Sequence, residues 1–159
     1  MRHFLVSLIL VAACATGPDE QRHTIFVGFD RVPTASDAAE LEALGGTIQH
    51  RMELARAVTV RSQLSASTFN SVSGVIATHD LGEEEDRTVS VFLRTGGTPT
   101  EADAQDVEDA GAQRAHLIGP PANLIAATIL LSRVPNLDEL DQFISIEVDF
   151  GITRIQPGR

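Results

Sequence analysis

Two stretches of the chain share one pattern of residues: PTASDAAELEALGG at positions 33–46 and PTEADAQDVEDAGA at positions 99–112. Six of the fourteen positions are identical, among them the proline, the threonine, the aspartate and one glycine. Proline and threonine followed by acidic residues favour a helix start, and glycine favours a helix end. Convergent helix-start chemistry is the alternative explanation, but both stretches also sit in the same order of apolar runs. We therefore predict two copies of one structural unit.

The first copy is predicted to span residues 23–80. Ile25, Val27 and Phe29 alternate with other residues, which is typical of a half-buried strand. Thr34 or Ser36 is expected to cap the helix that follows. The further elements that we expect are a helix end at Gly45-Gly46, strands over 47–52 and 57–61, a second helix carrying Phe69 and Val72, and a strand over 75–78.

The second copy is predicted to span residues 88–150. Val89, Val91 and Leu93 again alternate, and the turn at 119–121 contains two prolines that no strand could continue through. The further elements that we expect are a helix over 99–110, strands over 113–118 and 123–131, a helix opened by Pro135 and Asn136 that buries Leu137 and Leu140, and a strand over 144–149.

Both copies therefore follow the order strand–helix–strand–strand–helix–strand. The predicted fold class is α+β: two ferredoxin-like βαββαβ modules, each a four-stranded antiparallel sheet with two helices on one face. The other face of each sheet is expected to be open and available for binding. Residues 81–87 contain a Glu-Glu-Glu-Asp run and are predicted to be an acidic linker, and residues 151–159 form a C-terminal tail.

The first 13 residues have the order of a secretory signal peptide. Arg2 is followed by an apolar run over residues 4–11 and by two small residues. The run is much shorter than the roughly 20 apolar residues that a membrane-spanning helix needs. The residues Val-Ala-Ala-Cys at 11–14 resemble the lipobox of bacterial lipoproteins, in which the signal is cut before the cysteine and the thiol is acylated.

Cys14 is the one cysteine of the chain, so an internal disulfide is excluded. The alternative is an ordinary signal peptide in which Cys14 has no special role. We expect residues 1–13 to be the signal and residues 14–22 to be a lipidated tether. The mature protein is then exported and lipid-anchored in the bacterial cell envelope, and Ala15 after the cysteine implies the outer membrane.

The chain is acidic, with 12 basic and 22 acidic residues and a formal net charge of −10. It contains no tryptophan or tyrosine that could stack on bases. A chain of this composition is a poor nucleic-acid binder, and anionic lipid headgroups repel it. We therefore expect no nucleic-acid partner, and we expect contact with the membrane through the lipid anchor.

Several short motifs occur in a definite order along the two copies. They are Thr24–Phe29, Leu44–Gly46, Ala57–Val60 and Gly74–Ala77 in the first copy, and Leu124–Thr128 and Ile144–Asp149 in the second. These motifs and their order resemble those of subtilisin propeptides and the related protease inhibitors. The resemblance covers nearly all of residues 23–150, and the motifs are short.

The resemblance implies that the chain binds a subtilisin-like serine protease in trans, and that it inhibits the protease or assists its folding. In that family the open sheet face docks on two surface helices of the protease, acidic residues meet the helix N-termini, and the tail enters the active-site cleft as an extended strand. Glu147 and Asp149 match the acidic positions. The start of the matching tail is Phe150, Gly151, Ile152 and Thr153. In the first copy, Asp80 and the acidic run 83–86 occupy the corresponding place.

The sequence contains no motif of an enzyme. It has no Gly-x-Ser-x-Gly elbow, no His-Glu-x-x-His helix and no phosphate-binding glycine loop. His50 and His116 are equivalent in the repeat, but no cysteine or paired histidine at ligand spacing accompanies them. We expect a non-enzyme with no metal and no cofactor.

Two further functions are open to such a chain. One is a structural interaction module that bridges envelope proteins through tandem ferredoxin-like units. The other is a small-molecule sensor with a ligand between the copies. A bridging role predicts that the sheets pack together or form one apolar patch, and a sensor role requires a pocket at the interface.

Overall fold

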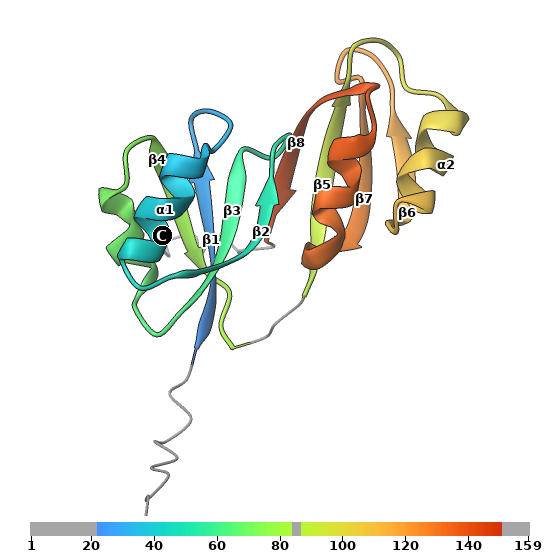
Figure 1. Ribbon diagram of the computed structural model, residues 1–159. Coiled ribbons are helices and arrows are strands. Elements are labelled where there is room, and N and C mark those ends of the chain that lie inside the picture. The colour runs from blue at the N-terminus through green and yellow to red at the C-terminus, as the bar shows by residue number, and fades with distance from the viewer. Residues whose placement is uncertain (1–21, 84–86, 151–159) are drawn as a thin grey trace, which may run out of the picture.

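The computed structural model describes residues 22–83 and 87–150 and shows a mixed α+β chain with two sheets (Figure 1). Module 1 contains β1 (His23–Phe29), α1 (Ala35–Ala43), β2 (Thr47–Met52), β3 (Ala57–Ser62), the 3₁₀ helix η1 (Ala66–Ser71) and β4 (Val75–Asp80). Module 2 contains β5 (Thr88–Thr95), α2 (Glu101–Asp109), β6 (Gln113–Ile118), β7 (Leu124–Leu130), the 3₁₀ helix η2 (Leu131–Glu139) and β8 (Phe143–Asp149). The predicted α+β class with two four-stranded antiparallel sheets is confirmed.

The two sheets have the same strand order and an equivalent register. The order is β2-β3-β1-β4 in module 1 and β6-β7-β5-β8 in module 2. Phe26 of β1 lies opposite His79 of β4, and Phe92 of β5 lies opposite Glu147 of β8. Both central strands also have a register shift near their C-terminal ends, at Gly28/Phe29 and at Arg94/Thr95. Phe26 and Phe92 are therefore equivalent positions of the two modules.

The matching sequence stretches form the two α-helices. Thr34 caps α1 and Thr100 caps α2, and in each case the aspartate three residues later completes a capping box with the cap backbone. Of the two cap candidates in the first copy, Thr34 is therefore the one used. Each helix is followed by a glycine with positive φ, Gly45 at +95° and Gly111 at +108°. The left-handed conformation explains why a glycine stands at both positions.

The second helical segment of each module is a 3₁₀ helix. In module 2 its start also differs from the prediction, which placed the start of the last helix at Pro135. Helix η2 begins earlier, at Leu131, and encloses Pro135. Its buried residues Leu131, Val134 and Leu137 are three apart, so they share one face at three residues per turn. Leu140, expected inside that helix, follows it and is only partly buried.

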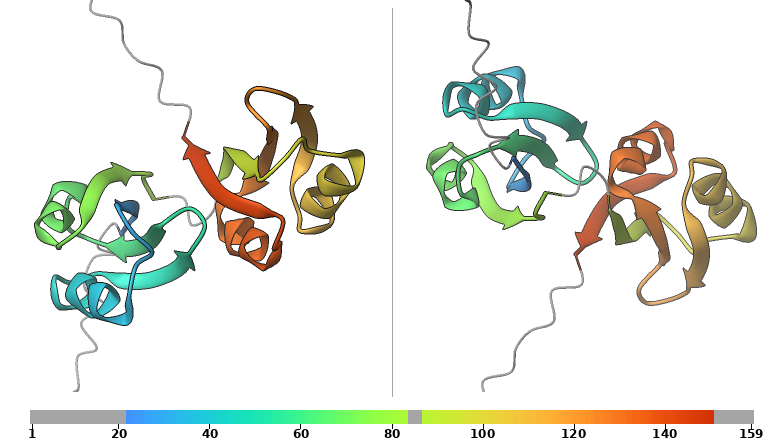
Figure 2. Two further views of the ribbon diagram at one scale, coloured as in Figure 1. Left: turned by 90° about the horizontal axis from the view of Figure 1, so that it is seen from above. Right: turned by 90° about the horizontal axis from the view of Figure 1, so that it is seen from below.

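The apolar residues form two clusters. The smaller cluster belongs to module 1 alone and includes Ile25, Val27 and Phe29 of β1. The larger cluster contains the core of module 2 and continues into module 1 through a further group of buried residues: Phe26, Met52, Ala57 and Leu81. The two modules thus share part of one core, and β2 and β8 lie at the junction between them (Figure 2).

No helix in the described part of the chain is long and apolar enough to cross a membrane.

Candidate functional site

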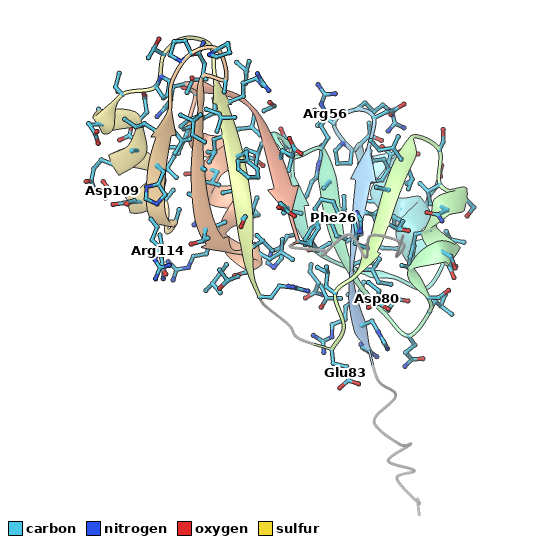
Figure 3. The ribbon with its side chains drawn as sticks, turned by 180° about the vertical axis from the view of Figure 1, so that it is seen from behind. Phe26, Arg56, Asp80, Glu83, Asp109 and Arg114 are labelled. Carbon is cyan, nitrogen blue, oxygen red and sulfur yellow. The ribbon has the colours of Figure 1, made fainter. Side chains whose placement is uncertain are left out.

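Each sheet has one face that is covered by helices and one that is not, and the alternation of side chains decides which residues lie on which face. In β5, Val89, Val91 and Leu93 are buried in the core under the helices. Phe92, between them, therefore points to the open face. Figure 3 views the molecule from the side opposite to Figure 1 and labels Phe26, which the register makes the equivalent residue of module 1.

The open face of module 2 has an apolar centre. It is formed by outward-facing residues of the three strands β5, β6 and β7: Phe92, Ile118, Leu124, Ala126 and Leu130. Phe92 lies opposite Ala126 and Ile118 lies opposite Leu124, and polar residues also lie opposite members of this group: Thr88 opposite Leu130, Arg94 opposite Leu124 and His116 opposite Ala126. Ile118 and Leu130 keep 40% and 39% of their surface exposed, and the other three are half-buried. This face therefore presents apolar surface to solvent.

Two of the predicted site residues lie beside this apolar centre, on the edge strand β8. Glu147 is exposed and lies opposite Phe92, and Asp149 is exposed and lies opposite Ser90. The Glu147 side chain makes no hydrogen bond or ion pair with the described residues, so its carboxylate is open to solvent. Arg94, opposite Ser145, adds a positive charge further along the same face.

Phe150, the next residue, lies against module 1 instead. Its ring makes an edge-to-face contact with Phe26, with centroids 4.7 Å apart and planes at 64°. The ring of His79 is 5.4 Å from it on the same face. Phe150 is 9% exposed and belongs to the larger core cluster. The open face of module 1 is therefore occupied, at its centre, by the C-terminal end of module 2.

Backbone hydrogen bonds hold the same junction at the turn between β2 and β3. The Asp138 carboxylate of η2 accepts from the backbone N–H of Glu53 at 2.6 Å and from that of Leu54 at 2.9 Å. The backbone N–H of Ile146, on the outer edge of β8, donates to the carbonyl of Leu54 at 3.1 Å. The turn of module 1 thus covers an edge strand of module 2.

The charge of Asp138 is costly at this position. Burial at the junction raises the pKa of the Asp138 carboxyl group, and the hydrogen bonds from Leu54 and Glu53 oppose the rise without cancelling it. Glu53 also raises this pKa through its own negative charge. Part of the gain from the two hydrogen bonds is therefore offset by the loss of solvation.

The structure separates the predicted site residues into two groups. Glu147 and Asp149 lie together at the open face of module 2, and Phe150 lies on module 1. The remaining predicted positions, Cys14, Gly151, Ile152 and Thr153, lie outside the described residues, as does most of the acidic run 83–86.

The acidic position of the first copy needs a correction. Glu147 corresponds in register to His79 and not to Asp80. Asp80 lies opposite Ile25, and its carboxylate pairs with Nδ1 of His23 at 3.1 Å.

Sequence reasoning missed the residues that join the modules, Phe26, His79 and Asp138. The one available signal was that Phe26 and Phe92 are aromatic residues at equivalent, outward-facing places of two β-patterned runs. Nothing local to Asp138 distinguishes it from the other carboxylates of an acidic chain.

The described residues contain no metal cluster, and two of their cavities occupy equivalent places in the two modules. Within the described part of the chain, no group of three or more His, Cys, Asp or Glu side chains is placed to hold a metal ion. A cavity of about 310 Å³ lined by Arg22, Thr47 and Arg61 lies in module 1. An equivalent one of about 240 Å³ beside Gly111 and Arg133 lies in module 2. Each lies within one module, whereas the sensor hypothesis requires a site between them.

No protein-family model matches the chain, and no curated protein matches it at a significant level.

Proposed function

We propose that this chain is a lipid-anchored envelope protein of two ferredoxin-like modules that binds a subtilisin-like serine protease in trans and inhibits it or assists its folding. The resemblance of the sequence to subtilisin propeptides motivates the choice of partner. The strand order of each sheet, with the helical segments on one face, is compatible with the ferredoxin-like plan.

The observation that carries the proposal is the position of Glu147 beside Phe92 on the exposed face of module 2. An apolar sheet face can bury surface against the helices of a partner. A carboxylate at its edge can accept hydrogen bonds from the exposed N–H groups at a helix N-terminus, where the helix dipole also favours negative charge. Module 2 offers this combination, whereas the centre of the module 1 face is taken up by Phe150.

The alternative function is a structural module that bridges other envelope proteins. One observation favours it: the open face of module 1 already packs against the end of module 2. Such packing is what a chain built for protein–protein contacts without any protease would also show.

The test is inhibition of a panel of subtilisin-type proteases by residues 15–159. A chain that ends at Phe150 is the appropriate truncation, because it removes the tail and keeps the Phe150 ring on Phe26. Glu147→Gln tests the carboxylate. Glu139→Gln, which changes an exposed carboxylate of η2 on the other side of the sheet, is its matched control.

The proposal expects tight inhibition that is lost in the chain ending at Phe150. It also expects inhibition about 2–5-fold weaker in Glu147→Gln, as for the loss of one charge at a helix N-terminus, and unchanged in Glu139→Gln. Absence of inhibition and of assisted folding across the panel would overturn it and leave the bridging function.

A further inference from the structure

Phe26 and Phe92 occupy equivalent positions on the open faces of the two modules, but their surroundings differ. Phe26 is 7% exposed and is covered by the ring of Phe150, whereas Phe92 is only half-buried. The residue across the strand differs as well, His79 beside Phe26 and Glu147 beside Phe92. An aromatic ring beside Phe26 extends the apolar contact to Phe150, and a carboxylate at the same place does not.

We propose that Phe150 is a latch: the open face of module 1 is a receptor for the chain's own C-terminal end, and the bound ring keeps the two modules closed. The part of this inference that concerns protease binding rests on the proposed function, and the latch itself does not.

The contacts described across the junction are of a kind that can open and close. They are one aromatic ring on a sheet face, two hydrogen bonds to a carboxylate whose burial costs solvation, and one backbone hydrogen bond at a strand edge. Met52, Ala57 and Leu81 add the apolar contact of the shared cluster. Neither sheet contains a strand of the other module. Separation of the modules therefore does not require unfolding of either sheet.

The latch has a consequence for the proposed inhibitor. Phe150 is the first residue of the segment that matches the inhibitory tail. A ring buried between Phe26 and His79 cannot enter the cleft of a protease at the same time. Engagement of the tail from Phe150 onward is thus coupled to opening of the modules, and a variant that opens them exposes this residue.

Three backbone amides report directly on the closed state, since Glu53, Leu54 and Ile146 all donate across the junction. We would measure their hydrogen exchange in residues 15–159 and in Phe150→Ala. The matched control is Phe92→Ala, which removes an equivalent aromatic ring that Phe150 does not cover. The latch predicts exchange at least about 10-fold faster in Phe150→Ala and unchanged in Phe92→Ala. Equal exchange of these amides in all three chains would overturn it.

A second measurement does not remove Phe150. Chymotrypsin, whose binding pocket accepts an aromatic side chain, should cut after Phe150 slowly in the closed chain. Phe26→Ala should increase this rate about 10-fold and Phe92→Ala should leave it unchanged. Persistent slow exchange at Val27 and Val91, in the central strands, would show that the sheets remain folded. A rate unchanged by Phe26→Ala in a folded chain would contradict the latch.

These outcomes can be told apart from those of the protease test. The exchange and cleavage experiments contain no subtilisin-like protease, so they can support the latch even if no protease is inhibited. Conversely, inhibition that is equally strong in residues 15–159 and in Phe26→Ala would retain the proposed function and overturn the coupling of the latch to the tail.

Discussion

The carboxylate of Asp138 accepts a hydrogen bond of 2.9 Å from the backbone N–H of Leu54, a residue 84 positions earlier in the chain. The bond joins the 3₁₀ helix of module 2 to the β2–β3 turn of module 1. A second bond from Glu53 to the same carboxylate satisfies two consecutive amides of one turn. These bonds contribute polar contacts to the junction, beside the apolar contact of Phe150 with Phe26.

Replacement of Asp138 by asparagine is expected to weaken the junction. An amide group offers one acceptor oxygen to two N–H donors, so one of the two hydrogen bonds is lost. Hydrogen bonds to charged groups contribute more than neutral ones, but here the burial that raises the pKa of Asp138 offsets part of the gain. We expect a loss of about 1 kcal/mol in the free energy of unfolding, together with faster exchange at Glu53 and Leu54.

The control for this change is Asp141→Asn, since Asp141 is an exposed carboxylate three residues further along. It removes the same charge without touching the turn. Chemical denaturation of both variants at pH 7 gives the comparison. Equal stability of the two variants would mean that the Asp138 bonds contribute nothing at the junction.

The fold of each module was predictable because its signals are local. Alternation over β1 and β5, the capping boxes and the glycines after each helix all lie within a few residues of the structure they specify. The 3₁₀ character of η1 and η2 was not predicted, although the buried residues three apart, such as Leu131 and Val134, carried that signal.

The arrangement of the two modules was not predictable in the same way. Phe150 follows Asp149 directly in the sequence, yet the two residues belong to different surfaces. A pattern of alternation assigns a residue to a face of its own sheet and says nothing about what lies across from that face. The junction depends on pairs such as Phe26 with Phe150 that are far apart in sequence, and a single sequence does not pair them.

Asp37 provides a prediction about pH. Its carboxylate is 3% exposed, lies 2.8 Å from the Arg31 guanidinium and accepts bonds from the backbone and hydroxyl of Thr34. Burial raises the pKa of Asp37, but these hydrogen bonds and the Arg31 charge outweigh it and hold the pKa below its usual value. Because the pKa is lowered on folding, the stability that the carboxylate contributes is present above about pH 4 and is lost as the pH falls through the folded value.

We therefore expect Asp37→Asn to lower the free energy of unfolding by about 2 kcal/mol at pH 7, with a smaller difference from the parent chain below pH 4. Asp103→Asn is the matched variant, because Asp103 has the same capping role but no ion pair among the described residues. Its cost should be about 0.5 kcal/mol, at the low end for a cap. Denaturation at pH 7 and at pH 3 would check both values. If Asp37→Asn lowers the free energy of unfolding by the same amount at pH 3 as at pH 7, the assigned role of the charge is contradicted.

Cys14 lies outside the described residues, and its predicted lipidation can be tested by itself. Growth with a labelled fatty acid should label the exported chain, and Cys14→Ser should abolish the label because no other thiol is present. The same variant should leave the membrane fraction, since several acyl chains hold a protein at a bilayer and the acidic surface does not. Label retained in Cys14→Ser would refute the lipobox interpretation.

Gly46 and Val60 of module 1 correspond to Ala112 and Ala127 of module 2. A Cβ on Gly46 would collide with Val60 Cγ1 and lie 2.9 Å from the Leu41 carbonyl oxygen. Gly46→Ala alone should therefore cost about 2 kcal/mol of unfolding free energy through overpacking. In Gly46→Ala/Val60→Ala the collision with the valine is gone, as in the alanine pair of module 2, so the double variant should lose less than the sum of the two single variants. A double-mutant cycle at pH 7 measures this coupling. The control for adding a methyl group is Gly96→Ala, because a Cβ at Gly96 meets nothing within 4 Å. Strictly additive changes in the free energy of unfolding would show that the two positions do not compensate each other.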